Sequence, residues 1–176
     1  KDVSCYGKDD GEIVVMAENG VAPYEIIIIN VDNGDTVVNA KGVWMNTFRH
    51  TDRAGNYWLK IGDAEGRVFI DNIIIKQPER ILPSVTVKNA SCKYNTNDGA
   101  LSITSTGGVG GYTYVWNDGS TDSTRNNLAP GYYQFTVTDR NGCEIVSGRI
   151  IGYNDSIEVE QGYQENVCIN SNVNVI

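Results

Sequence analysis

An internal repeat constrains the fold of this 176-residue chain more than any other feature of its sequence. The segment Asn19–Tyr24 is echoed by Gly107–Tyr112, 88 positions later, and Ala54–Tyr57 is echoed by Pro130–Tyr133, 76 positions later. Self-similarity of this kind predicts two tandem modules of one architecture. The first copy carries 12 more residues between its two matched segments, and we interpret them as an insertion in a connecting loop.

Both copies have the composition of short strands separated by tight turns. Val, Ile, Thr and Tyr fill the stretches between Gly-containing turns, and we find no convincing run with a helical period. Apolar residues alternate with polar ones after Gly131, which predicts a core-facing side made of Tyr133, Phe135 and Val137. The same pattern in the first copy comprises Tyr57, Leu59 and Ile61. In the second copy we predict strands near 84–90, 100–106, 112–117, 122–127, 131–139 and 144–151.

The predicted fold class is all-β, with two tandem immunoglobulin-like β-sandwich modules plus a short C-terminal strand segment. The predicted boundaries are 1–78, 79–153 and 154–176, where the last segment is the start of a further module or an added strand. Residues 77–83 hold two prolines and two charged residues, which is typical of a short, stiff linker.

Two features predict how the cores close. The Gly-x-Tyr sequences at Gly55–Tyr57 and Gly131–Tyr133 resemble a tyrosine corner, in which the hydroxyl fixes the entry of a strand. Trp116 is expected at the centre of the second module. Its counterpart in the first copy is Ile28, so the two cores must pack differently.

Charge and cysteine usage limit the function classes. The net charge is -8, which argues against a nucleic-acid partner, and no apolar run approaches the roughly 20 residues of a membrane span. The chain begins at Lys1 without a signal peptide, so we expect a fragment or a mature portion of a longer protein.

The cysteines Cys5, Cys92, Cys143 and Cys168 are widely spaced, which disfavours zinc and favours disulfides in an oxidising compartment. Because Cys92 and Cys143 both lie at module edges, we predict a disulfide between them. The partners of the other two cysteines stay open.

Few residues offer chemistry. His50 is the only histidine, and a solvated loop position suits it better than a catalytic triad. Asp9, Asp63, Asp98 and Asp139 recur in both copies and are candidates for a calcium site, although turn formation explains the same residues without a metal. Otherwise we expect no cofactor.

Aromatic residues of the first copy are candidates for ligand contact. Trp44 and Phe48 lie in the insertion, and Trp58 lies on the polar-facing side of its strand. Exposed aromatic rings can stack on sugars or anchor a protein partner. These side chains can equally close the core or an interface between modules.

The second copy resembles one repeat of the SprB family. The resemblance covers 90–143, and weakly 3–68, where Arg67 replaces the closing cysteine and the tryptophan is absent. It is carried by a series of motifs in order: Cys92, Asn97-Asp98-Gly99, Gly107-Gly108, Tyr112-Thr113-Tyr114-Val115-Trp116-Asn117-Asp118-Gly119, Pro130-Gly131-Tyr132-Tyr133 and Asp139-Arg140-Asn141-Gly142-Cys143. SprB repeats occur along large surface proteins of Bacteroidetes, including the gliding-motility adhesin. The resemblance therefore implies export by the type IX route, and O-glycans at Thr36, Ser123 and Ser156, which lie in Asp-Ser/Thr-apolar triplets.

The functional hypothesis from the sequence is a non-catalytic repeat segment of a large bacterial cell-surface adhesin, acting as spacer and adhesive module. The alternative is a carbohydrate-binding accessory module of a secreted glycan-processing protein. The expected partners are neighbouring repeats of the same chain, and surface polysaccharide or host glycan. No nucleic acid partner and no membrane insertion are expected.

Overall fold

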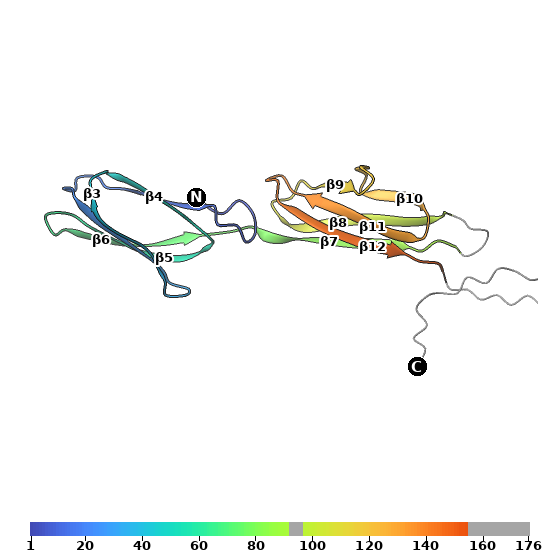
Figure 1. The fold of residues 1–176 in the computed structure, drawn as a ribbon, viewed down its shortest axis with the longest axis horizontal. Coiled ribbons are helices and arrows are strands. Elements are labelled where there is room, and N and C mark those ends of the chain that lie inside the picture. The colour runs from blue at the N-terminus through green and yellow to red at the C-terminus, as the bar shows by residue number, and fades with distance from the viewer. Residues whose placement is uncertain (92–96, 155–176) are drawn as a thin grey trace, which may run out of the picture. The chain divides into compact units, whose positions relative to one another are not determined.

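The computed structural model describes residues 1–91 and 97–154, and these form strands and turns without a helix. The chain divides into two compact units, residues 1–80 and 81–176 (Figure 1). The all-β prediction is confirmed. The C-terminal strand segment predicted beyond residue 154 lies outside the described residues.

The first unit is a sandwich of two antiparallel sheets. One sheet pairs β1 with β4, and the other has the order β3-β2-β5-β6. Alternate residues of β2 and β5 point into the core, where Ile28 is fully buried beside Leu59 and Tyr57. The strands are β1 (Gly11–Met16), β2 (Tyr24–Asn30), β3 (Thr36–Val43), β4 (Thr47–Asp52), β5 (Gly55–Gly62) and β6 (Val68–Ile75).

Strand β3 corrects one prediction. The extra residues of the first copy were expected to lengthen a loop, but the segment that contains them forms β3, which pairs with β2 through Val38 and Ile28. The sheet gains an edge strand in this way, because the outer edge of β2 offers backbone groups to any neighbouring extended segment. In the second unit β9, which is the counterpart of β2, is itself the edge strand.

The second unit is a sandwich of two three-stranded sheets with the orders β10-β8-β7 and β12-β11-β9. Trp116 is 2% exposed and meets Phe135 edge to face, with ring centroids 5.2 Å apart, as its predicted central position requires. Strand β7 begins inside the segment predicted as a linker. The strands are β7 (Glu79–Lys88), β8 (Gly99–Gly108), β9 (Thr113–Trp116), β10 (Thr124–Leu128), β11 (Gly131–Thr138) and β12 (Glu144–Ile151).

Both predicted tyrosine corners are confirmed. The Tyr57 hydroxyl donates to the carbonyl of Arg53 at 2.8 Å, and the Tyr133 hydroxyl donates to the carbonyl of Ala129 at 2.9 Å. The acceptor lies four residues upstream in each case, at the entry to β5 and to β11. Burial, with the nearby Asp52 carboxylate, raises the pKa of Tyr57 to about 12, so the hydroxyl stays a donor at any physiological pH.

Each unit also ties the segment that precedes β1 or β8 to the residue that follows its last strand by a matching pair of bonds. In the first unit Val3 N–H donates to the Lys76 carbonyl at 2.9 Å, and Lys76 N–H donates to the Asp2 side chain at 2.9 Å. In the second unit Ala90 N–H donates to the Gly152 carbonyl at 3.0 Å, and Gly152 N–H donates to Asn89 at 3.1 Å. We call this pair of bonds the terminal latch.

Candidate functional site

The recurring aspartates Asp63 and Asp139 organise equivalent turns. The Asp139 carboxylate accepts backbone N–H groups from Val109 at 3.0 Å, Asn141 at 2.9 Å and Cys143 at 3.0 Å. The Asp63 carboxylate accepts the N–H groups at the three equivalent positions: Val21 at 3.1 Å, Glu65 at 3.1 Å and Arg67 at 2.9 Å. Each aspartate thus joins the turn after one strand to a loop far away in the sequence.

The N–H donors around Asp63 and Asp139 stabilise the charged form of both carboxylates. Burial raises the pKa of Asp139, but the N–H groups of Val109, Cys143 and Asn141 outweigh it, so this pKa lies below its ordinary value. The same balance lowers the pKa of Asp63, with help from the Arg67 guanidinium. Their donor-filled surroundings favour the turn interpretation, since a calcium ion needs six to eight oxygen ligands around it.

The other two calcium candidates lie before β1 and β8. Asp98 accepts the N–H of Ser91 at 2.6 Å, and Asp10, the neighbour of the exposed Asp9, accepts the N–H of Ser4 at 2.8 Å. Within residues 1–91 and 97–154, no three His, Cys, Asp or Glu side chains gather closely enough to hold a metal ion. The absence of a bound calcium ion stays a prediction, which melting with and without calcium must test.

The aromatic ligand candidates do not form one platform. Trp44 is 75% exposed in the turn after β3, whereas Phe48 packs against the core of the first unit. Trp58 is half-buried in β5 opposite Ile29, five residues along β2 from Tyr24. Because Tyr24 pairs with Val43, next to Trp44, the two tryptophans are separated by about 16 Å along the strands.

His50 lies on strand β4, so its predicted loop position is wrong. It is half-buried, and its Nε2 lies 3.2 Å from Asp52 Oδ2. Of the predicted glycosylation positions, Thr36 and Ser123 are exposed, whereas Ser156 lies outside the described residues.

Both cysteines that the structure describes, Cys5 and Cys143, are disulfide-bonded. Disulfides agree with the oxidising compartment that the sequence indicated. Cys92 and Cys168 lie outside the described residues, so the pairing of Cys92 with Cys143 stays a prediction.

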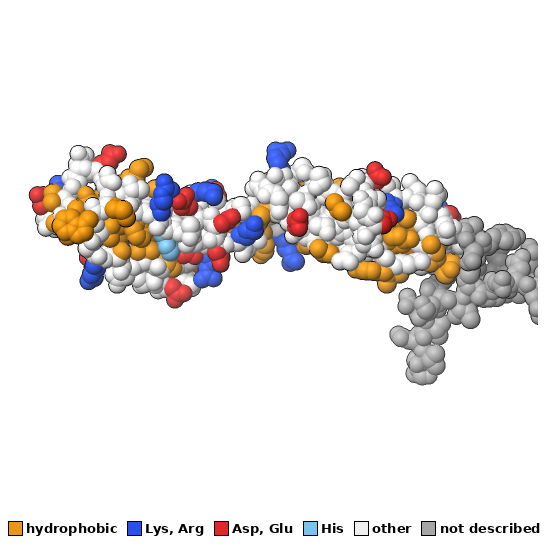
Figure 2. Space-filling model, turned by 45° about the horizontal axis from the view of Figure 1, so that its top comes forward, with side chains coloured by type: hydrophobic (Ala, Val, Ile, Leu, Met, Phe, Trp, Pro, Cys, Tyr) orange, Lys and Arg blue, Asp and Glu red, His pale blue; other side chains and the backbone are white. Residues whose placement is uncertain are grey.

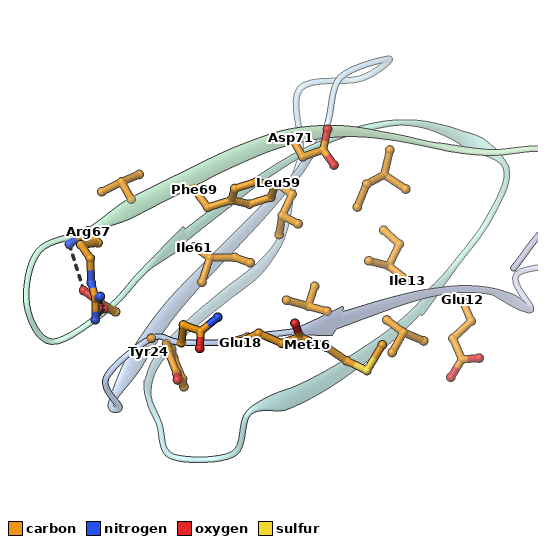
Figure 3. Close-up of a pocket in the computed structure, with 18 of the residues that line it drawn as sticks. Glu12, Ile13, Met16, Glu18, Tyr24, Leu59, Ile61, Arg67, Phe69 and Asp71 are labelled. Carbon is orange, nitrogen blue, oxygen red and sulfur yellow. Dashed lines mark hydrogen bonds and ion pairs between the residues drawn. The ribbon is translucent and has the colours of Figure 1, made fainter.

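A cleft of about 770 Å³ opens between β1 and β6 in the first unit (Figure 3). Its walls are the segment from Glu12 to Gly20 on one side and Leu59, Ile61 and Phe69 on the other. The ion pair of Arg67 with Asp63 lies at one end. Sequence reasoning missed this cleft, because it depends on which strand edge stays open rather than on any motif.

A second surface is apolar and recurs in both units. On β6, Ile70 and Ile74 are exposed, and on β12 the residues 76 positions later, Val146 and Ile150, are exposed too. We call these four residues the outer stripe, and Figure 2 shows hydrophobic side chains on the surface of each unit. The sequence carried a signal for it: an unbroken Ile73-Ile74-Ile75 run places apolar residues on both faces of an edge strand.

These sheets and tyrosine corners define a tandem immunoglobulin-like β-sandwich protein, as the sequence predicted. The SprB repeat family model matches residues 1–33 and 84–121, near the beginning of each unit, and this match confirms the resemblance to that family. No curated protein matches the chain.

Two solved structures show similarity to the chain at low identity. The crystal structure of Dpr11 IG1 bound to DIP-gamma IG+IG2 is 10% identical with a TM-score of 0.33, over 82% of this chain and 92% of that one. The crystal structure of DIP-gamma IG1+IG2 is 9% identical with a TM-score of 0.41, over 83% of this chain and 91% of that one. Among the described residues, no helix is long and apolar enough to cross a bilayer.

Proposed function

We propose that the chain is a non-catalytic segment of a large bacterial cell-surface adhesin, exported by the type IX route, in which each unit serves as spacer and adhesive module. The SprB repeat match at both units supports the repetitive surface protein. The bonded cysteines support export to an oxidising compartment. Neighbouring repeats of the same long chain are the first partners of each unit.

The outer stripe carries the adhesive part of this proposal. In both units the stripe lies on the sheet face that points away from the core, because Leu59 and Phe135 on the neighbouring strands point inward. These apolar side chains therefore do not contribute to the sandwich core. Exposed apolar residues at matching positions of two divergent copies support a contact surface for another molecule.

Adhesion of coated beads tests the proposal. Beads carrying residues 1–176 should adhere to glass or to a film of purified surface polysaccharide. Replacing Ile70, Ile74, Val146 and Ile150 together by Thr should reduce adhesion about tenfold, while Asn72→Thr, on the same face of β6, should leave it unchanged. Equal adhesion of the fourfold variant would exclude the outer stripe as the contact. Beads that adhere to neither film would leave the segment with the spacer role alone.

A carbohydrate-binding accessory module is the second candidate, and the exposure of Trp44 favours it. A ring that is 75% exposed beside the exposed Met45 is free to stack on a sugar. A glycan array probed with the native chain and with Trp44→Ala and Trp58→Ala separates the two functions. Glycan binding that is lost in Trp44→Ala but kept in the stripe variant would support this second function.

A further inference from the structure

In the part of the chain that the structure describes, one side of β1 has no neighbouring strand. By the repeat, β1 corresponds to β8, which lies between β10 and β7 in the second unit. Among the described residues, β1 pairs with β4 alone as a strand, and its other edge holds only Lys1. Among residues 1–91 and 97–154, no strand therefore fills in the first unit the position that β7 fills in the second.

The backbone of β1 is oriented to accept a strand there. Glu12 donates its N–H to the Lys1 carbonyl at 2.9 Å, and its carbonyl accepts the Lys1 amino group at 2.7 Å. Because backbone groups alternate between the two edges of a strand, those of Val14 and Met16 point to the same side as those of Glu12. An edge with unpaired N–H and C=O groups is a template for another strand.

The cleft beside β1 matches the space that β7 occupies in the second unit. Its wall from Glu12 to Gly20 corresponds to Ala100–Gly108, which is nearly all of β8. In the second unit the buried Ile81 of β7 lies against Gly108, where an added Cβ would come within 3.0 Å of it. Gly20, the counterpart of Gly108, lines the cleft.

The Phe69 side chain is left exposed to solvent beside the open edge of β1. Phe69 lies opposite Ile61, which in turn pairs with the buried Ile26, so Phe69 is on the core-facing side of its sheet. It is nevertheless 57% exposed, because the cleft leaves it uncovered. An apolar side chain entering the cleft would remove this ring from water.

We propose that the β1 edge accepts one extended strand of the β7 type, and that its donor is the segment directly before Lys1 in a longer form of the same chain. The second unit supports this choice of donor, because its own β7 lies directly before Asn89 and Ala90, the residues that correspond to Asp2 and Val3. The terminal latch fixes the register: Val3 corresponds to Ala90, so Lys1 corresponds to Lys88, the last residue of β7. Apolar residues at alternate positions of β7, beginning with Ile81, give the chemistry of the donor.

A chain lengthened at its N-terminus tests the proposal. A copy of residues 79–87 placed directly before Lys1 should fill the cleft in the register of β7. Hydrogen exchange of the Val14 and Met16 amides should then slow at least tenfold. The Ile13 and Val15 amides, which point toward β4, should change much less and serve as internal controls. A copy with Asp in place of its isoleucine should give little protection.

The other outcomes overturn the proposal. Unchanged exchange at Val14 and Met16 in the lengthened chain would show that the edge does not accept this strand. If the unmodified chain protects these two amides with increasing concentration and sediments as a dimer, the occupant is a second copy and the upstream donor is wrong.

Discussion

Replacing Asp139 by Asn should destabilise the second unit strongly, although the two side chains have nearly the same shape. Oδ1 of Asp139 accepts two N–H groups and Oδ2 accepts the N–H of Val109. If the amide oxygen of Asn keeps the first two bonds, its NH₂ group faces the Val109 N–H, donor against donor. Losing one bond to a charged acceptor in a buried site costs about 2–3 kcal/mol.

This loss can be measured by calorimetry. For a domain of this size, 1 kcal/mol corresponds to about 4–8 °C, so Asp139→Asn should lower the Tm of the second unit by about 10–20 °C at pH 7. Asp63→Asn is the matched change in the first unit. Asp122→Asn, at an exposed position of the second unit, is the control and should change Tm little.

The pH dependence supplies the sharper test. The folded pKa of Asp139 lies below its ordinary value of 3.8, so its carboxylate stabilises the fold above that value. This stabilisation is lost as the pH falls through the folded pKa. The difference between native and Asp139→Asn chains should therefore be full at pH 7 and shrink below about pH 4. A variant that melts within about 2 °C of the native chain at pH 7, or a difference that does not depend on pH, would refute the reasoning.

Four further predictions rest on the structure or on the sequence. Tyr57→Phe and Tyr133→Phe should each lower the free energy of unfolding in urea by about 0.5–1.5 kcal/mol. If neither variant changes it, the tyrosine corners do not contribute to stability. Trp116→Ala should cost about 3–5 kcal/mol, or abolish folding of the second unit, as followed by its melting transition. Non-reducing peptide mapping should join Cys92 to Cys143, and any other partner for Cys143 would contradict that pairing. Melting with millimolar calcium and with EGTA should give one Tm, since a bound ion would raise it.

The fold class could be predicted from the sequence because local signals agreed with one another. The Gly-x-Tyr entries before Tyr57 and Tyr133, together with the alternation that follows them, located β5 and β11 and their buried faces. The strands predicted in the second copy lie close to β7 through β12 for the same reason. Trp116 was also expected at the centre of the second module, and it is buried there.

What the sequence left out depends on contacts between distant segments. Thr36–Val43 resembles a loop insertion until the free edge of β2 is known, because only that edge makes it a strand. Asp63 and Asp139 were found as recurring residues, yet their bonds to Val21 and Val109 join segments that no local pattern connects. The cleft likewise depends on β1 having no strand on that side among the described residues.

The terminal latch determines how a module would respond to traction along its chain. The bridge between Ala90 and Tyr153 is parallel, and it joins the segment that follows β7, the first strand of the second unit, to the segment that follows β12, its last strand. Tension applied through the two ends would slide these segments past each other, so the bonds at Ala90 would be loaded together in shear rather than opened one after another. The corresponding bonds at Val3 and Lys76 form the terminal latch of the first unit.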